Sequence, residues 1–161
     1  MENFGGHTYA AGLSLKEENL EAFKERFLKL AAEEIIPEQM IPQIDIDATL
    51  DLQDINQQFM NELKKMSPFG PDNQKPIFAS LKVKDYGTSK LVGKDLEHIK
   101  LEVIDDKSNT PIHGIAFGMH QHNAHIKEMK PFNICYTIEE NTYNGNTTLQ
   151  LMVKDIKENE M

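Results

Sequence analysis

The spacing of hydrophobic residues divides the chain into a helical first part and a strand-rich second part. Small and apolar residues at 10–15 predict a short buried strand. Ser14, a residue type that favours helix starts, precedes a polar first turn. From Leu20 apolar residues recur at steps of three and four, which predicts an amphipathic helix to about Glu34, ended by Pro37.

Two further elements lead to a segment rich in proline and glycine. Ile44–Asp47 alternates apolar and acidic residues and predicts a strand. A second helix is predicted from about Leu52 to Met66, with one apolar stripe formed by Ile55, Phe59, Leu63 and Met66. Residues 67–76 hold three prolines and one glycine, so we expect a rigid connection and the main domain boundary there.

Beyond residue 76 the hydrophobic period becomes that of strands. Alternation predicts strands at 77–86, 97–104, 132–138 and 149–153, and an apolar run predicts a further strand at 112–117, five in all. A short helix or loop is predicted at 118–130, and Asn144-Gly145 is a strong hairpin signal. Five strands with a short helix between the third and fourth match the plan of an oligonucleotide/oligosaccharide-binding (OB) barrel.

Composition narrows the class of protein. With 161 residues, 39% of them hydrophobic, the chain can form one domain or two small ones. A single cysteine, Cys135, excludes an internal disulfide and fits a reducing compartment. No apolar run approaches the ~20 residues that span a bilayer, and no basic-then-apolar signal pattern opens the chain. We therefore expect a cytoplasmic protein without a membrane partner.

The net charge of −9 argues at first sight against nucleic acid as a partner. The acidity is concentrated in residues 1–75, which hold 7 Lys/Arg and 14 Asp/Glu. Residues 76–161 hold 10 Lys and 12 Asp/Glu, so a local lysine-lined face is compatible with the second half.

The stretch Phe4–Gly12 combines bare backbone with a titratable ring. Gly5 and Gly6 let a ligand approach the main chain, and His7 can donate a hydrogen bond or, when protonated, offer positive charge. The stretch suits a phosphate contact, although such a short motif is more often a glycine turn before a strand.

Three segments, in this order, resemble one known family. Residues 5–12 are similar to the signature of a DHH-associated domain. Residues 68–76 resemble a Pro-Phe-Gly-x-Gly-Asn-x-x-Pro junction, with Asp72 where glycine is commoner. Four motifs of the second half resemble an OB domain: Val92-Gly93, His98–Leu101, Gly114–Gly118 and Leu149–Leu151. Together they resemble the C-terminal portion of the RecJ family, single-strand-specific DNA exonucleases of the DHH phosphoesterase superfamily.

The resemblance implies an α+β fold in three parts. Residues 1–50 would be the C-terminal part of a DHH-associated domain, within a truncated α/β unit that has two helices. Residues 51–76 would be a connecting helix and a Pro/Gly linker, and residues 77–161 a five-stranded OB barrel.

The resemblance also implies a function that this chain would share with parts outside it. RecJ enzymes degrade single strands from the 5′ end in repair and recombination, with manganese or magnesium held by an N-terminal DHH domain. No Asp-His-His triplet occurs here, so no metal ligand is assigned and the isolated chain is expected to be inactive. Gly5, Gly6 and His7 would contact the substrate phosphate in the intact enzyme. The implied partners are single-stranded DNA and the DHH domain, with a single-strand-binding protein or a helicase as further candidates.

The barrel would hold the incoming strand. On OB folds the second and third strands and nearby loops form the nucleic-acid face, with cations for phosphates and rings for bases. The candidates are Lys82, Lys84, Tyr86, Lys90, Lys94, His98, Lys100 and Tyr143. Each lysine alone also fits an ordinary solvated position, and the second half has no tryptophan or arginine. Tyr136 is assigned to the core.

Two alternatives accompany this interpretation. His120, His122 and His125 have a spacing that suggests metal binding, but a structural zinc site usually needs four ligands and Cys135 is an uncertain fourth. A solvated loop is therefore favoured. The alternative function is a free-standing OB module that binds protein partners through its acidic helices.

Overall fold

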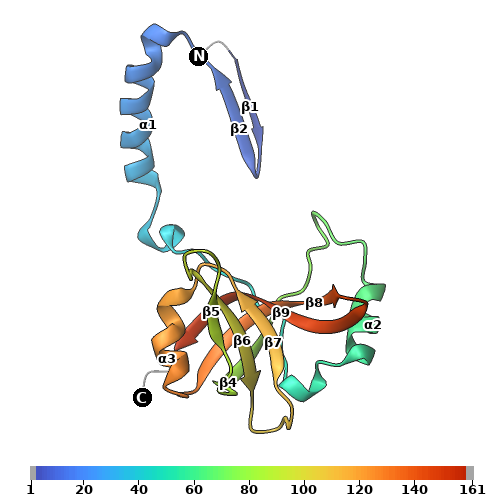
Figure 1. The fold of residues 1–161 in the computed structure, drawn as a ribbon. Helices are drawn as coiled ribbons and strands as arrows, with labels where there is room; N and C mark the ends of the chain where they lie inside the picture. The colour runs from blue at the N-terminus through green and yellow to red at the C-terminus, as the bar shows by residue number, and fades with distance from the viewer. Residues whose placement is uncertain (1–2, 159–161) are drawn as a thin grey trace. The chain divides into compact units, whose positions relative to one another are not determined.

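The chain folds as two units, Met1–Ile44 and Asp45–Met161, in a computed structural model that describes residues 3–158 (Figure 1). The first unit contains the antiparallel hairpin of β1 (Asn3–His7) and β2 (Ala10–Ser14) and the helix α1 (Leu20–Glu34). One 3-10 turn, Glu17–Asn19, precedes α1, and another, Pro37–Met40, follows it. The predicted bounds of this helix are confirmed.

No described residue of the first unit is fully buried. The strand predicted at 10–15 exists as β2, but the prediction that it is buried is wrong. A two-stranded hairpin and one helix do not supply enough apolar surface for a core. Apolar side chains of α1 are consequently exposed, as Phe27 illustrates at 58% of its surface. Ser14 does not cap the helix, since the 3-10 turn begins after Lys16 without any side-chain cap.

The second unit is built on one seven-stranded sheet. Its strands are β3 (Ala48–Thr49), β4 (Phe78–Asp85), β5 (Lys90–Val92), β6 (His98–Ile104), β7 (Ile112–Ala116), β8 (Phe132–Tyr143) and β9 (Asn146–Glu158). The strand order is β3-β4-β8-β9-β7-β6-β5, and β4 also pairs with β6. The pairings therefore form a closed circuit, β4-β6-β7-β9-β8. Strands occur at all five predicted places, and the sheet has two short strands more, β3 and β5.

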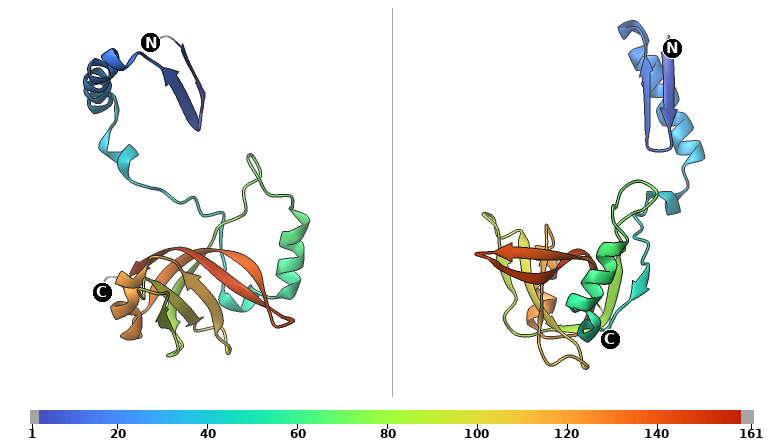
Figure 2. Two further views of the ribbon diagram at one scale, coloured as in Figure 1. Left: turned by 45° about the horizontal axis from the view of Figure 1, so that its top comes forward. Right: turned by 90° about the vertical axis from the view of Figure 1, so that its right-hand side faces the viewer.

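Two helical regions, one with α2 and one with α3, lie at opposite ends of this sheet (Figures 1 and 2). The helix predicted over 52–66 is interrupted: a 3-10 turn, Leu52–Asp54, is followed by α2 (Gln57–Lys65). Asn56 causes the break, because its extended backbone and its side chain, which accepts the Phe59 N–H at 3.0 Å, start a new helix. The short helix predicted before the fourth strand is present as the 3-10 turn His120–His122 and α3 (Asn123–Lys127).

Turn chemistry explains the long hairpin of β8 and β9, which curves across the sheet toward α2 (Figure 2). Asn144 and Gly145 have φ values of 49° and 80°, the left-handed pair that a two-residue hairpin turn requires. Lys64 Nζ lies 2.6 Å from Glu140 Oε1 and joins α2 to this hairpin.

Pairing along the sheet begins later than the sequence predicts. Ile44–Asp47 is not a strand, because only its last residue bonds to a neighbour: Asp47 N–H donates to Ile77 O at 2.8 Å. The strand β3 follows it and runs parallel to β4. The proline- and glycine-rich segment 67–76 lies inside the second unit, where the Asn73 side chain donates to Met66 O and Pro68 O.

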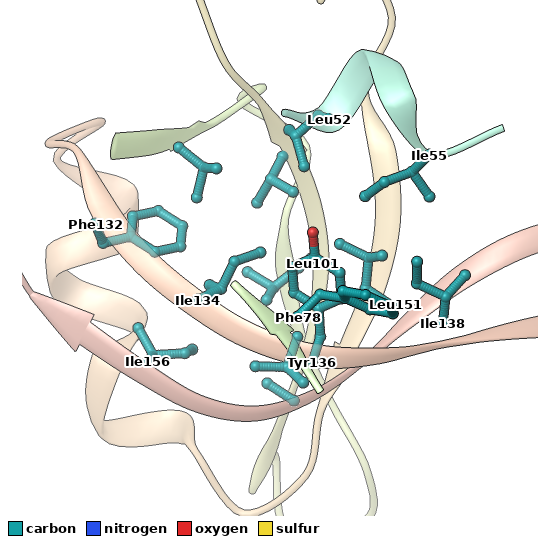
Figure 3. Packing of buried hydrophobic residues seen from close by; sticks show 14 of the residues in the cluster. Leu52, Ile55, Phe78, Leu101, Phe132, Ile134, Tyr136, Ile138, Leu151 and Ile156 are labelled. Atoms are coloured by element: carbon teal, nitrogen blue, oxygen red, sulfur yellow. The ribbon is translucent and has the colours of Figure 1, made fainter. Parts of the chain in front are cut away.

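The core of the second unit fills the space inside the closed circuit of strands (Figure 3). Leu52 and Ile55 of the 3-10 region pack against strand residues such as Leu101 and Leu151. Tyr136 is fully buried, as predicted, and its Oη lies 2.6 Å from Ser80 Oγ. Because Ser80 Oγ donates to Leu50 O at 2.7 Å, the tyrosine hydroxyl is the donor to Ser80.

A β-bulge in β4 changes which side chains face inward. The register with β8 shifts between Ser80 and Val83, and Lys82 has a φ of 56°. Leu81, which simple alternation with Ala79 and Val83 would turn inward, is therefore 57% exposed. Lys82 N–H donates to Asn133 Oδ1 at 2.9 Å, which fixes the bulge against β8.

Candidate nucleic-acid interface

Three strands present a common outward face, which we call the β5–β7 face. Ile99, Leu101 and Val103 of β6 are fully buried, so His98 and Lys100 project outward. Lys90 of β5 pairs with Lys100, and Ile115 of β7 pairs with it from the other side. Directly paired residues share a face. Two lysines therefore lie next to each other, beside an apolar position.

A fixed aromatic ring lies at one end of the β5–β7 face. Phe117, directly after β7, is 54% exposed. Its ring meets the His98 ring edge to face, with centroids 4.9 Å apart at 79°. His98 Nδ1 accepts the Gly118 N–H at 3.0 Å, and its Nε2 lies 3.3 Å from Glu97 Oε1. These contacts assign the proton of the neutral ring to Nε2, and they hold both rings in one orientation.

Glu97 supports this arrangement as a charged group. Hydrogen bonds from the backbone amides of Glu97 and Asp95 lower the pKa of the Glu97 carboxyl, and the neighbouring His98 and His120 lower it further. Gly93 has a φ of 97°, a backbone conformation that favours glycine. A Cβ at this position would also lie 2.5 Å from Glu97 Oε2 and would displace the carboxylate.

The other predicted DNA contacts are spread over the second unit. Lys84 pairs with Ile104, four residues along β6 from Lys100, and its Nζ lies 3.5 Å from Asp106 Oδ1. Tyr86 is half exposed next to β6, where its N–H donates to Glu102 O at 2.8 Å. Lys94 is exposed in the loop after β5.

Two predicted contacts lie apart from these. Lys82 lies on the bulge beside β8. Tyr143 ends β8 opposite Asn146, and its side chain is outside the part of the chain that the structure describes. The structure therefore brings together Lys90, His98 and Lys100.

Sequence reasoning missed several polar residues beside the β5–β7 face. Together with the predicted Lys100 they line one hollow, and they come from β7, β8 and β9: His113, Asn141, Asn146, Thr148 and Gln150. It also missed Phe117, because the sequence pattern placed this residue in a strand without predicting whether its side chain faces inward or outward. The alternation of Gly114 and Ala116, both buried, with Ile115 was the available signal that Phe117 points outward.

The predicted phosphate contact lies in the first unit. Gly5 and Gly6 are strand residues opposite Gly12 and Ala11, so the alternative of a glycine turn is wrong. Gly6 lets β1 lie close to β2, because a Cβ at this position would lie 2.9 Å from Ala10 O. His7 is exposed at the end of β1. Its Nδ1 accepts the Tyr9 N–H at 3.2 Å, which leaves Nε2 for a ligand.

The histidines near α3 contact one carboxylate. His122 Nδ1 and His125 Nδ1 lie 2.8 Å and 3.4 Å from the two oxygens of Glu158. Both rings are largely covered, so these two do not belong to a solvated loop as predicted. Among residues 3–158, no group of three His, Cys, Asp or Glu side chains is arranged to hold a metal ion. None of the described helices is long and apolar enough to span a membrane.

Comparison with known proteins gives a consistent result. Residues 46–155 match the model of the RecJ OB domain. The single-stranded-DNA-specific exonucleases RecJ of Salmonella typhimurium and Bacillus subtilis are 28% and 27% identical to 97% and 96% of this chain. The crystal structure of RecJ in complex with Mn²⁺ from Thermus thermophilus has the same fold over 99% of the chain, with a TM-score of 0.75 and 20% identity. The crystal structure of the same Thermus protein in complex with Mg²⁺ matches with a TM-score of 0.74.

The match covers only part of each relative. The chain spans 26% of the Salmonella protein, 19% of the Bacillus protein and 22% of the Thermus chain with Mn²⁺.

Proposed function

Because the chain belongs to the RecJ OB domain family, we propose that it is the C-terminal DNA-binding portion of a RecJ-like single-stranded-DNA-specific exonuclease. Such an enzyme would degrade single strands from the 5′ end in DNA repair and recombination, in the cytoplasm. The observation that carries the proposal is the β5–β7 face inside the matched region, where Lys90 and Lys100 are adjacent and Phe117 is exposed. Cations of this kind hold phosphates, and exposed rings stack on bases.

Strand pairing supports placing the DNA on this face. We infer that the circuit β4-β6-β7-β9-β8 is the five-stranded OB barrel, to which β3 and β5 are additions. In that arrangement β6 and β7 are the second and third strands, the ones whose face binds oligonucleotides in OB folds. The proposed contacts extend from there to Lys82, Lys84, Tyr86, Lys94 and Tyr143.

The first unit would serve the catalytic part of the intact enzyme. We assign residues 1–50 to the end of a DHH-associated domain, and residues 51–76 to the connection with the OB domain at 77–161. Gly5, Gly6 and the free Nε2 of His7 would contact the substrate phosphate there. Manganese or magnesium, the ions in the matching RecJ structures from Thermus thermophilus, would be held by a DHH domain outside this chain.

The partner of the chain would then be that DHH domain in the same polypeptide. A single-strand-binding protein or a helicase is a further candidate partner.

Titration of the 161-residue chain with labelled single- and double-stranded oligonucleotides, at two salt concentrations, tests the proposal. We expect preference for single strands and an affinity that falls with salt. The double variant Lys90→Ala/Lys100→Ala should reduce the slope of log K against log salt by about 1.4, because each lost phosphate contact accounts for roughly 0.7.

The matched control removes two lysines elsewhere in the second unit, Lys65→Ala/Lys130→Ala, each of which pairs with a glutamate near it in sequence. This control should leave binding unchanged. Absence of single-strand binding at low salt would favour the protein-interaction module instead. The chain should also fail to cleave DNA with manganese or magnesium, and robust cleavage by the pure chain would contradict the assignment.

A further inference from the structure

The polar hollow beside the β5–β7 face is assembled from distant parts of the chain. His113 of β7 pairs with Gln150 of β9, and Asn141 of β8 pairs with Thr148 of β9. Together with Lys100 and Asn146, these side chains line the hollow. Part of its wall is thus the β8–β9 hairpin, which corresponds to one of the loops that contact oligonucleotides in OB folds.

The chemistry of the hollow is that of unpaired amides. Within the described part of the chain, the amide groups of Asn141, Asn146 and Gln150 make no hydrogen bond to the protein. Each amide presents an acceptor oxygen and an NH₂ donor. His113 Nδ1 lies 3.3 Å from Glu102 Oε1, so Glu102 orients this ring. The other ring nitrogen, Nε2, is left for a ligand.

Charge around the hollow disfavours a second phosphate there. Lys100 is the one cation among the six described lining residues apart from the titratable His113. Glu102 pairs with His113 at one border, and Glu139 pairs with Gln150 in the ladder while its Oε1 lies 2.8 Å from Lys75 Nζ. A ligand group with several neutral donors and acceptors fits this lining better than an anion does.

We propose that the hollow is a subsite for one nucleobase of the bound single strand and binds the edge of that base by hydrogen bonds. Lys100 and Lys90 hold the adjoining phosphate. The inference rests on the proposed single-strand binding and adds a contact that depends on bases. Amide side chains are well suited to it, because they match adjacent donor and acceptor positions on base edges. Stacking on Phe117 alone would tolerate any base.

The test compares a labelled mixed-sequence oligonucleotide with an abasic oligonucleotide of equal length and charge, each bound to the 161-residue chain. A Phe117→Ala background removes the stacking contribution. In that background we expect about tenfold tighter binding of the base-containing strand, the factor that about 1.4 kcal/mol of base-edge contacts gives. The triple variant Asn141→Ala/Asn146→Ala/Gln150→Ala, added to this background, should abolish most of the difference.

Gln53→Ala, which removes an exposed amide on the 3-10 turn before α2, is the matched control and should keep the difference. Circular dichroism of every variant checks that it is folded. Single-strand binding with equal affinity for both oligonucleotides, or a triple variant that behaves like the control, overturns the base subsite alone. Failure to bind either strand, with Phe117 intact, overturns the proposed function and this inference with it.

Discussion

His98 acts on the β5–β7 face by positioning another side chain. Both of its ring nitrogens are engaged, one by the Gly118 N–H and one by Glu97. The edge-to-face contact then fixes the exposed Phe117 ring. A ring held in one orientation loses little freedom on binding, which favours stacking. Phe117 is therefore the residue whose loss should be most visible in DNA binding.

Phe117→Ala should weaken single-strand binding by about 5- to 150-fold, the range that corresponds to about 1–3 kcal/mol for one stacked base. Fluorescence anisotropy at several salt concentrations measures it. The salt dependence should stay unchanged, because the ring carries no charge. Phe117→Tyr should retain most of the affinity, and Leu81→Ala, at a similarly exposed apolar position, should have no effect. A reduced salt slope in Phe117→Ala would contradict a stacking role.

Tyr136 makes the stability of the fold sensitive to high pH. Burial raises the pKa of its hydroxyl from 10.0 to about 12. The folded state keeps the proton that the unfolded state releases, so this stabilisation is complete below pH 10 and is lost as pH rises toward 12. Tyr136→Phe lacks this dependence. At about pH 8 the variant should be about 1 kcal/mol less stable, since the hydrogen bond to Ser80 is lost.

At about pH 11 the wild type should have lost about 1.4 kcal/mol relative to the variant, which is the free energy of one pKa unit, so the difference in stability should vanish or reverse. Urea unfolding at both pH values measures it, and the lysines that titrate in this range cancel between the two proteins. A difference that stays constant between the two pH values would show that Tyr136 ionises equally in both states.

At the scale of elements, the turn after β6 ties the sheet to the 3-10 region that covers its core. Asp105 Oδ2 accepts the Leu52 N–H at 2.8 Å, and its Oδ1 accepts the N–H groups of Ser108 and Lys107. Burial alone would raise the pKa of Asp105, but these hydrogen bonds outweigh it and the pKa is lowered. The charged carboxylate thus stabilises the fold above pH 3.8, and this is lost as pH falls through the lower folded value.

Asp105→Asn should destabilise the protein by about 1–3 kcal/mol at neutral pH, as expected for weakened hydrogen bonds to a charged group. The cost should diminish as pH falls below 3.8 and through the lowered pKa at which the folded wild-type carboxyl becomes protonated. Chemical unfolding as a function of pH measures it. Asp106→Asn, on the next and exposed residue, should change stability by less than about 0.5 kcal/mol. Equal effects of the two substitutions would rule out the anchoring role of Asp105.

Elements with strict alternation could be predicted from sequence, whereas their exceptions depend on neighbours. His98 and Lys100 were found because the buried positions beside them on β6 force these side chains outward, whereas Lys90 lies on β5, a strand that the pattern did not predict. The bulge at Lys82 could not be seen, since it follows from the register with β8 and the contact to Asn133.

Long-range pairing limits sequence prediction of the site in the same way. The hollow was missed because its amides, such as Gln150, reach His113 only through pairing of β7 with β9. At the start of the chain, the small and apolar residues of β2 predicted the strand correctly. They could not predict its burial, because burial depends on whether other parts of the chain cover the strand.

For the whole molecule, the two units should differ sharply in stability. Every described residue of the buried core lies between Leu52 and Ile156, within the second unit. The first unit keeps α1 and its hairpin without a buried residue among those described. Cooperative unfolding depends on buried apolar surface. The second unit should therefore account for nearly all of the free energy of unfolding of the chain.

Hydrogen exchange of the 161-residue chain should show rapid exchange over residues 3–44 and slow exchange in β6, β8 and β9. A chain of residues 45–161 should keep the melting temperature of the longer chain within about 2 °C, since one kcal/mol shifts a domain of this size by roughly 4 °C. Single-strand affinity should also be preserved, because the β5–β7 face lies entirely in this unit. A strong fall in melting temperature on removing residues 1–44 would mean that the first unit stabilises the second, and the division into independent units would be wrong.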